Sequence, residues 1–355
     1  MEITQLVQFY NEMNVLGKFP DFLCIVFVSN DSNNFNDNDH LSECVTSHER
    51  AEIVNAFRAI ANFVISYKSE TEFIQNMDEL KRRFKYVLVY SMAQNTNGIG
   101  RRCLIPLLCE HFNLYNISAD FYTSVLGGNK VLMHELVKGH PGMYFPITYI
   151  YENRADIHYI QHFYNNLMNF MVKPNSESAS IGVNKINVRE MSIDKATEII
   201  QGLYNIHGTL IFQQYITGKE VEVPVIAHKG SYFTPEAIEI VFPEGSDFLD
   251  SHIVANESYD FNIYRGPHKE GLITAARHCA KLLRFSAISR IDFRVNEENY
   301  YIMDITPNPT ISSKSSTHVM FENLFNGDQD AAYKMLVFEA VRSRNLLEPS
   351  FNPTK

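Results

Sequence analysis

Two neighbouring segments of the sequence say most about its architecture: Arg290-Ile-Asp-Phe-Arg-Val295 and Tyr300-Tyr-Ile-Met-Asp-Ile-Thr-Pro-Asn-Pro309. Residues 290–295 and 300–305 alternate as two short strands do, and the polar residues 296–299 between them form a turn, so the pattern predicts a β-hairpin. Asp292 and Asp304 are then expected to point to the same face. Adjacent carboxylates repel one another unless a cation neutralises them, and hard oxygen ligands suit Mg²⁺. The alternative is a pair of aspartates on a solvated hairpin face.

The length and composition are those of a soluble protein with more than one domain. The 355 residues exceed the usual size of a single hydrophobic core, so two or three domains that share a cleft are expected. Hydrophobic residues make up 45% of the chain, and no apolar run approaches the roughly 20 residues of a membrane span. The N-terminus shows no basic region followed by an apolar stretch, which favours the cytoplasm.

The net charge indicates which ligands to expect, and the cysteine content indicates whether disulfide bonds are expected. A net charge of −10 without a long basic cluster argues against nucleic acid and favours a small anionic ligand. The five cysteines contain no Cys-x-x-Cys pair, and an odd number argues against a disulfide framework.

The first third of the chain has the pattern of an α/β domain. Short apolar runs at 22–28 and 86–90 predict strands, whereas residues 49–67 and 101–112 carry helical spacing. The polar segment 29–38 follows the first strand directly, at the edge where open α/β sheets face ligands. Later segments predict a strand over 167–173, a helix over 192–203, and strands over 210–215 and 221–227.

Two loops carry residues of interest. Residues 174–183 form a Ser-rich loop between two β segments, which can offer backbone N–H groups to phosphate. Asn97-Gly-Ile-Gly100 carries part of a dinucleotide fingerprint but lacks its third glycine and the following acid. A turn with positive φ before a helix at Arg101 is the favoured interpretation of these glycines.

Six motifs in order resemble the ATP-grasp ligases, specifically the D-alanine–D-alanine ligase branch, from about residue 115 to 316. They are Lys130, Lys173-Pro174, Ser180-Ile-Gly182, Gln213-Gln-Tyr-Ile-Thr-Gly-Lys-Glu220, Arg290-Ile-Asp292 and Asp304-Ile-Thr-Pro-Asn-Pro309. The resemblance implies a three-domain ATP-grasp fold: a Rossmann-like preATP-grasp domain over 1–116, a central lobe over 117–205 and a C-terminal lobe over 206–355. It also implies ATP held between the two lobes, Mg²⁺ ions, and assembly as a homodimer.

The resemblance assigns roles to individual residues. Lys130 and Lys173 look like the pair that contacts the nucleotide phosphates. Gln213 stands where the family has an acid beside adenine, and its amide oxygen can still accept from the adenine amino group. Glu220 resembles the acid that binds the ribose hydroxyls. The full set of implied nucleotide-binding residues is Lys130, Lys173, Glu177, Ser180, Gln213, Gln214, Tyr215, Ile216 and Glu220.

The metal site and the reaction centre are implied in the same way. Asp292 and Asp304 match the two acidic Mg²⁺ ligands, although Asp304 is a methylene shorter than the usual glutamate. Thr306 replaces an asparagine and is the weaker ligand, so Asn308 is a further candidate. Arg290 resembles the catalytic arginine that stabilises the acyl phosphate, a role that suits a permanently charged fork.

The residues that are expected to bind the substrate depart from the family pattern. The usual serine of the Ser-rich loop falls on Ala179, and Arg101 and Arg102 replace two acids, so the substrate is expected to differ from D-alanine. An arginine pair can clamp a carboxylate. Candidate substrate-binding residues are Glu43, Arg101, Arg102, Ser315 and Ser316.

The implied activity is ATP-dependent activation of a carboxylate as an acyl phosphate, followed by attack of an amine from an amino acid or small peptide. Specialised metabolite assembly is the expected setting. Two alternatives stay open: a nucleotide-binding protein of the same fold without turnover, and a ligase with a thiol or hydroxyl acceptor such as a carrier protein arm.

Overall fold

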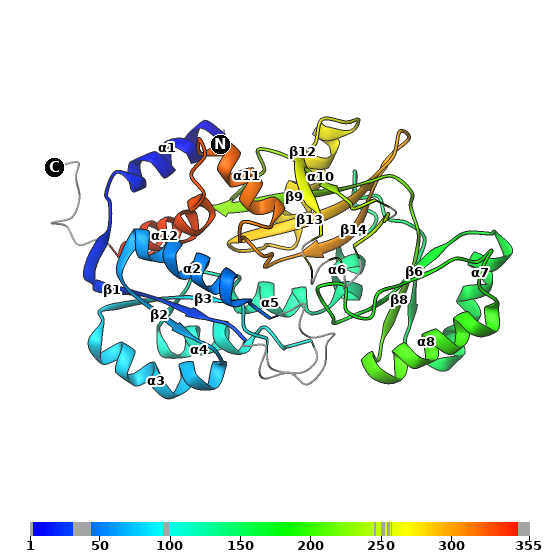
Figure 1. Ribbon diagram of the computed structural model, residues 1–355, viewed down its shortest axis with the longest axis horizontal. Coiled ribbons are helices and arrows are strands. Elements are labelled where there is room, and N and C mark those ends of the chain that lie inside the picture. The colour runs from blue at the N-terminus through cyan, green and yellow to red at the C-terminus, as the bar shows by residue number, and fades with distance from the viewer. Residues whose placement is uncertain are drawn as a thin grey trace.

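The computed structural model describes the chain over residues 3–30, 44–94, 99–244, 246–249, 253, 256 and 258–346. These residues form three β-sheets with helices packed on them (Figure 1). The first sheet is parallel and the other two are antiparallel. The predicted α/β fold of three parts is therefore confirmed.

The N-terminal domain is built on the parallel sheet, in the order β2-β1-β3-β4. Most of β1 and β3 is buried, which explains their continuous apolar runs. The elements are α1 (Ile3–Asn14), β1 (Phe19–Val28), α2 (Ser47–Ile60), β2 (Ala61–Tyr67), α3 (Glu70–Arg83), β3 (Tyr86–Ser91), α4 (Leu104–Phe112) and β4 (Tyr115–Asn116).

Two sequence predictions in this domain were wrong at their boundaries. The helix predicted over 49–67 ends at Ile60, and Ala61–Tyr67 form the edge strand β2 beside β1. Aromatic and β-branched residues in that stretch favour a strand once β1 offers its edge. The helix predicted from Arg101 begins at Leu104, after a turn in which Gly100 has no positive φ.

The central lobe is a four-stranded sheet in the order β5-β8-β6-β7, covered by helices. Since β8 pairs with β5 and β6, this sheet extends to residue 214, beyond the predicted domain boundary at 205. The elements are α5 (Phe121–Gly127), α6 (Lys130–Val137), β5 (Thr148–Tyr151), η3 (Arg154–Tyr159), α7 (Ile160–Asn165), β6 (Phe170–Pro174), β7 (Asn184–Ile186), α8 (Ile193–His207) and β8 (Leu210–Gln214).

The C-terminal lobe is the largest sheet, in the order β12-β11-β9-β13-β14 with β10 paired to β9. The hairpin predicted from residues 290–305 is confirmed as β13 and β14. The elements are β9 (Lys219–His228), β10 (Ser231–Phe233), β11 (Ile238–Val241), β12 (Asp260–Ile263), α10 (Lys269–Leu282), β13 (Ile288–Val295), β14 (Tyr300–Thr306), α11 (Ser316–Leu324) and α12 (Ala331–Ser343).

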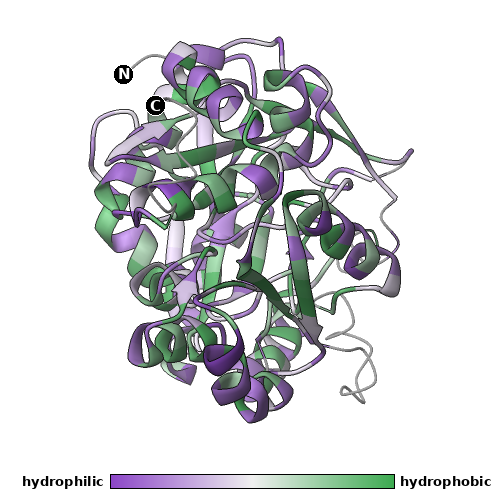
Figure 2. Ribbon diagram, turned by 90° about the vertical axis from the view of Figure 1, so that its left-hand side faces the viewer, coloured by the Kyte–Doolittle hydropathy of each residue, from purple (hydrophilic) through white to green (hydrophobic). Residues whose placement is uncertain are grey.

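Hydrophobic packing connects the last helices of the chain to the N-terminal domain and connects α6 to the C-terminal lobe. Helix α12 shares a hydrophobic core with α1, α2 and β1, so the C-terminal helices pack on the N-terminal domain. Helix α10 covers β9 and β13, and α6 joins the same core. Green, hydrophobic residues run along the strands in Figure 2, while the helices show purple, polar sides. In the part of the chain that is described, no helix has both the length and the apolar character needed to cross a membrane.

Candidate functional site

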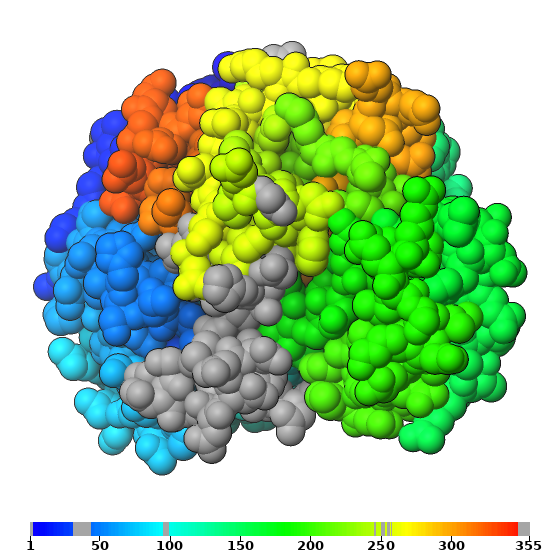
Figure 3. All heavy atoms as spheres, turned by 45° about the vertical axis from the view of Figure 1, so that its right-hand side comes forward, coloured from blue at the N-terminus to red at the C-terminus, as the bar shows by residue number. Residues whose placement is uncertain are grey.

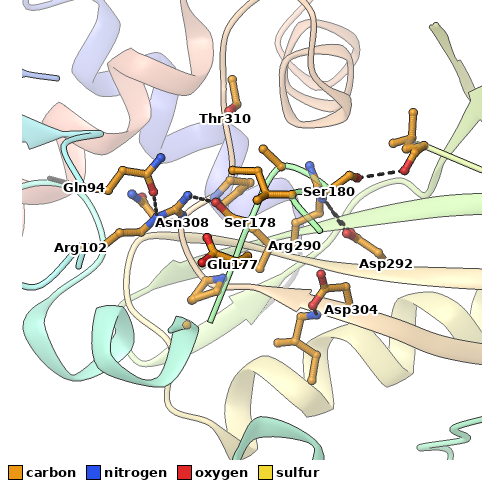
Figure 4. Close-up of a pocket in the computed structure, with 18 of the residues that line it drawn as sticks. Gln94, Arg102, Glu177, Ser178, Ser180, Arg290, Asp292, Asp304, Asn308 and Thr310 are labelled. Carbon is orange, nitrogen blue, oxygen red and sulfur yellow. Dashed lines mark hydrogen bonds and ion pairs between the residues drawn. The ribbon is translucent and has the colours of Figure 1, made fainter. Parts of the chain in front are cut away.

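A cavity of about 370 Å³ lies where the three parts of the molecule meet. Figure 3 shows a face on which the C-terminal lobe (yellow) adjoins the N-terminal domain (blue) on one side and the central lobe (green) on the other. The lining residues come from strands β3, β6, β9, β13 and β14, from the loops after β3, β6 and β14, and from helices α2, α4, α5 and α6. Figure 4 shows the side chains that project into this cavity.

Three acids stand side by side on neighbouring strands at one end of the cavity. Asp292 on β13 is paired in register with Glu222 on β9 and with Asp304 on β14. Directly opposed residues of antiparallel strands point to the same face, so the predicted proximity of Asp292 and Asp304 is confirmed. The sequence interpretation missed Glu222, although the alternation in β9 puts it on the same face as Glu220.

Arg290 bridges two of these acids. Its Nε lies 2.7 Å from Asp292 Oδ1 and its Nη2 lies 2.9 Å from Asp292 Oδ2, which is a bidentate pair. The same Nη2 lies 3.1 Å from Glu222 Oε1. Burial raises the pKa of the Asp292 carboxyl, and Arg290 opposes that rise without cancelling it. Burial is therefore the larger influence on this carboxyl, and it disfavours the charged form.

Asp304 is the more accessible acid of the row. Its side chain is 33% exposed, and its Oδ2 lies 3.7 Å from Lys130 Nζ. Thr306 lies opposite Arg290 in the hairpin, and Asn308 donates to the backbone carbonyl of Ser91 over 3.4 Å. The described residues contain no ready-formed metal cage of three or more His, Cys, Asp or Glu. As the structure stands, both oxygens of Asp292 accept from Arg290 instead.

Lys173, on β6, also lines the cavity. Its Nζ donates to Gln213 Oε1 over 2.8 Å and to the Met303 carbonyl over 3.2 Å. Burial lowers the pKa of Lys173, and Asp304 counteracts that effect. Because a lysine can only donate, the Gln213 side chain turns its oxygen toward Lys173 and leaves its NH₂ for other partners.

An unpredicted arginine holds the candidate ribose-binding acid. Arg294 Nη2 donates to Glu220 Oε2 over 2.7 Å and to the Asp247 carbonyl over 2.7 Å. Its Nη1 donates to the Gly218 carbonyl over 3.0 Å. The alternation of β13 offered a signal for Arg294, because residues 290, 292 and 294 share one face. Tyr215 lies nearby, with Lys185 Nζ 3.8 Å from the centre of its ring.

The Ser-rich loop is tied to the N-terminal domain. Arg101 Nη1 lies 2.7 Å from Glu177 Oε2, and Arg102 Nη2 donates to Ser178 Oγ over 2.9 Å. Lys130 Nζ donates to the Glu177 carbonyl over 2.7 Å. Ala179 and Ser180 have φ values of 50° and 60°, a backbone conformation that L-residues other than glycine rarely adopt. These contacts hold the loop over the cavity.

Acid is expected to weaken this connection. His207, followed by Arg101, lowers the pKa of Glu177 to about 2, although burial opposes both. A carboxyl with a depressed folded-state pKa contributes stability above its unfolded pKa, near 4.5, and loses it as the pH falls toward 2. At pH 7 we expect Glu177→Gln to lower the free energy of unfolding by on the order of 1–3 kcal/mol.

Urea denaturation of the protein and of the Glu177→Gln variant, from pH 7 down to pH 3, checks this expectation. The difference between them should shrink steadily below about pH 4.5. A difference that stays constant over this range would contradict the assignment of the ion pair.

Of the predicted substrate-binding residues, Arg101, Arg102 and Ser315 line the cavity. Glu43 lies outside the described residues. Ser315 lines the cavity and caps α11, because its hydroxyl accepts from the His318 N–H over 3.1 Å. Ser316 is fully buried, and within the described residues its hydroxyl has no hydrogen-bond partner.

A glutamate that the sequence interpretation missed also lines the cavity. Glu49 is in the first turn of α2, and its Oε1 accepts from Ser312 Oγ over 3.4 Å. A helix start directly after a polar loop was the available signal, but the predicted helix began at Glu49 itself and hid the cap at Thr46.

Together, a three-lobed α/β fold and a cavity with two lysines, an acidic row and an arginine define the ATP-grasp class. Residues 150–337, just over half of the chain, match the family described as D-ala D-ala ligase C-terminus. The chain therefore belongs to the D-alanine–D-alanine ligase family, as its motifs predicted.

Individual relatives are distant. A D-alanine–D-alanine ligase of Flavobacterium psychrophilum is 26% identical over 149 residues, which cover 41% of this chain and 44% of that protein. One from Flavobacterium johnsoniae is 24% identical over 219 residues, which cover 61% and 66%. The crystal structure of D-alanine–D-alanine ligase from Bacillus anthracis complexed with ATP superposes with a TM-score of 0.66 at 14% identity, covering 91% of this chain and 98% of that one. At that identity the structural similarity shows the fold alone.

Proposed function

We propose that this protein is an ATP-dependent, ADP-forming ligase that activates a carboxylate and joins it to an amine. The observation that carries the proposal is the register-paired acids Asp292 and Asp304, with Arg290 between the acids and Lys173 and Lys130 beside them, in one cavity between the lobes. Electrostatic positioning of this kind is what phosphoryl transfer requires of a protein.

The nucleotide is proposed to lie along β6, β8 and β9, with its phosphates against Lys130, Lys173 and the Ser-rich loop. Two buried or half-buried lysines neutralise phosphate oxygens without needing to move far. Glu177 contributes through the backbone, because its carboxylate is taken by Arg101 and His207. Gln213 to Ile216 and Glu220 are proposed to meet the base and the ribose.

The residues of the acidic row fit Mg²⁺. Asp292, Asp304, Thr306 and Asn308 offer oxygen donors from one side of the cavity, which is the donor type that Mg²⁺ prefers. The ion would neutralise phosphate charge when bound. For Asp292 to take part, it must release Arg290, and Glu222 Oε1 already stands 3.1 Å from that guanidinium to keep it neutralised.

The proposed reaction has two steps. An oxygen of the substrate carboxylate bonds to the γ-phosphorus, the bond from that phosphorus to the bridging oxygen breaks, and ADP leaves. An amine nitrogen then attacks the acyl carbon, phosphate leaves, and the amine loses a proton to form the amide. Arg290 would stabilise the charge on the acyl phosphate and on the oxyanion of the second step.

We propose that the substrate differs from D-alanine and that the product belongs to specialised metabolism, as the changes at Ala179, Arg101 and Arg102 favour. A nucleotide-binding role without turnover is the second candidate, because Arg290 occupies both oxygens of Asp292. Location in the cytoplasm, homodimer assembly and a thiol or hydroxyl acceptor are further proposals that rest on the family resemblance.

The test is ADP release from ATP and Mg²⁺ in the presence of L- and D-amino acids, singly and in pairs, with product masses measured. We expect release that depends on a carboxylate and an amine together. If ATP binds in calorimetry but no combination releases ADP, the role without turnover replaces the ligase.

A further inference from the structure

Arg102 lines the cavity at the end away from the acidic row (Figure 4). It lies just before α4, and its Nε donates to Gln94 Oε1 over 2.7 Å while its Nη2 donates to Ser178 Oγ over 2.9 Å. Both of these acceptors are neutral. Within the described part of the chain, no carboxylate forms an ion pair with Arg102.

The neighbouring arginine shows the contrast. Arg101 Nη1 lies 2.7 Å from the Glu177 carboxylate, so its charge is balanced within the protein. Burial, followed by the charge of Arg101, lowers the pKa of Arg102 to about 10. A partly buried guanidinium with neutral partners retains donors and charge for an anion that enters the cavity.

The anion cannot be the carboxylate that reacts. The reacting carboxylate must reach the γ-phosphate beside Arg290, Asp292 and Asp304, which Figure 4 places at the other side of the cavity from Arg102. Asn308 and Ser178 lie near Arg102 in the same view, and both can add hydrogen bonds to an anionic group. Arg102 is therefore available to a second negative group of a substrate that fills the cavity.

A second charged group comes from the N-terminal domain. Glu49 lies in the first turn of α2, where its Oε2 accepts from the Thr46 N–H over 2.9 Å and its Oε1 accepts from Ser312 Oγ over 3.4 Å. Glu49 also lines the cavity and can accept hydrogen bonds from an ammonium group. A cation and an anion that line one cavity match the two charged groups of an amino acid.

We propose that Arg102 binds a second carboxylate of the donor substrate, so that the donor is a dicarboxylic acid, most simply an acidic amino acid activated on its side-chain carboxylate. This inference rests on the proposed ligase function and names its donor class. Glu49 is then placed to bind the α-ammonium group, and the side chain of the donor spans the cavity toward Arg290.

Hydroxylamine separates donor choice from acceptor choice. Its nitrogen attacks the acyl carbon of the acyl phosphate, phosphate leaves, and the nitrogen loses a proton to give a hydroxamate that is measured by colour. The experiment supplies ATP, Mg²⁺ and hydroxylamine to the full chain with L- and D-aspartate, L- and D-glutamate, succinate, glutarate, acetate, and L- and D-alanine. We expect hydroxamate from one or more dicarboxylates at a rate at least about 10-fold above any monocarboxylate.

Variants of Arg102 test the residue itself. Arg102→Gln should raise the KM for the dicarboxylate about 100-fold while kcat changes less than about 5-fold, because the guanidinium binds a group remote from the reacting carbon. Arg102→Lys keeps the charge without the fork and should recover part of the loss. Exposed Arg82 on α3 provides the matched control as Arg82→Gln, and thermal unfolding of each variant checks the fold.

The outcomes separate the two proposals. Hydroxamate from monocarboxylates, with a KM that Arg102→Gln does not change, overturns the dicarboxylate donor and leaves the ligase function intact. Absence of hydroxamate and ADP with every carboxylate, while ATP still binds, overturns the ligase function and the donor class with it. If Arg102→Gln fails to fold, the KM of Arg102→Lys for the dicarboxylate is measured in its place. A raised KM supports the dicarboxylate donor, and an unchanged KM overturns it.

Discussion

Asp292→Asn is expected to reduce ADP release on the order of 1,000-fold, the largest effect of any single change in this cavity. Asparagine keeps the shape of the side chain but removes the charge that binds Arg290 in the structure and that is proposed to bind Mg²⁺. Turnover should fall while the affinity for the nucleotide, measured by calorimetry without Mg²⁺, changes little. Steady-state ADP release across a range of Mg²⁺ concentrations measures the effect.

The control for this change lies on the same hairpin. Glu298→Gln makes the same chemical change in the exposed turn between β13 and β14 and should leave turnover unaltered. Breaking a buried ion pair costs about 3–5 kcal/mol, but Glu222 still pairs with Arg290, so Asp292→Asn should fold with reduced stability. A folded Asp292→Asn variant with unchanged Mg²⁺-dependent turnover would refute the metal assignment.

Arg290→Lys is expected to lower kcat on the order of 1,000-fold, although the charge is conserved. A lysine cannot make the bidentate contact with Asp292 and still reach Glu222, so the fixed fork of donors that is proposed to stabilise the acyl phosphate is lost. The dissociation constant of ATP should change far less than kcat. Single-turnover measurement of ADP formation, which isolates the first chemical step, distinguishes the two effects.

Arg277→Lys provides the matched control, because Arg277 is exposed on α10. If Arg290→Lys instead weakened ATP binding and left kcat unchanged, Arg290 would be a nucleotide ligand and the account of the acyl phosphate would need revision.

Short-range patterns were sufficient to predict the centre of the site. The hairpin of residues 290–305 could be predicted because strand alternation and a polar turn are local signals, and the register then places Asp292 opposite Asp304. The resemblance added the three-part ATP-grasp fold, whereas the hydrogen bond from Lys173 Nζ to Gln213 Oε1 was not predicted.

Features that depend on tertiary contact could not be predicted. Arg101 meets Glu177 across 76 positions of sequence, and no local pattern indicates that the two proposed ligand-binding residues bind each other. The strand β2 was misread as helix because its spacing suits both states, and only the edge of β1 decides between them. Glu222 and Arg294 were missed because strand alternation indicates which side chains share a face of the sheet, but not whether that face lines a cavity.

The acidic row explains how Asp292 can bind Arg290 in the structure and is proposed to bind a divalent cation during the reaction. In the structure Arg290 neutralises Asp292 and touches Glu222, so one guanidinium serves two carboxylates. A divalent cation at Asp292 and Asp304 would leave Arg290 paired with Glu222, whose pKa burial raises to about 8. Glu222 is therefore proposed to hold Arg290 in place during the reaction.

The most direct test of the proposed chemistry follows oxygen from the carboxylate to phosphate. The donor identified by hydroxamate formation is prepared with ¹⁸O in its reacting carboxylate, and the phosphate released with ADP is examined by mass spectrometry or by the ³¹P isotope shift. An acyl phosphate intermediate predicts one ¹⁸O atom in each phosphate released. Phosphate without label, or release of AMP and pyrophosphate, would contradict the account.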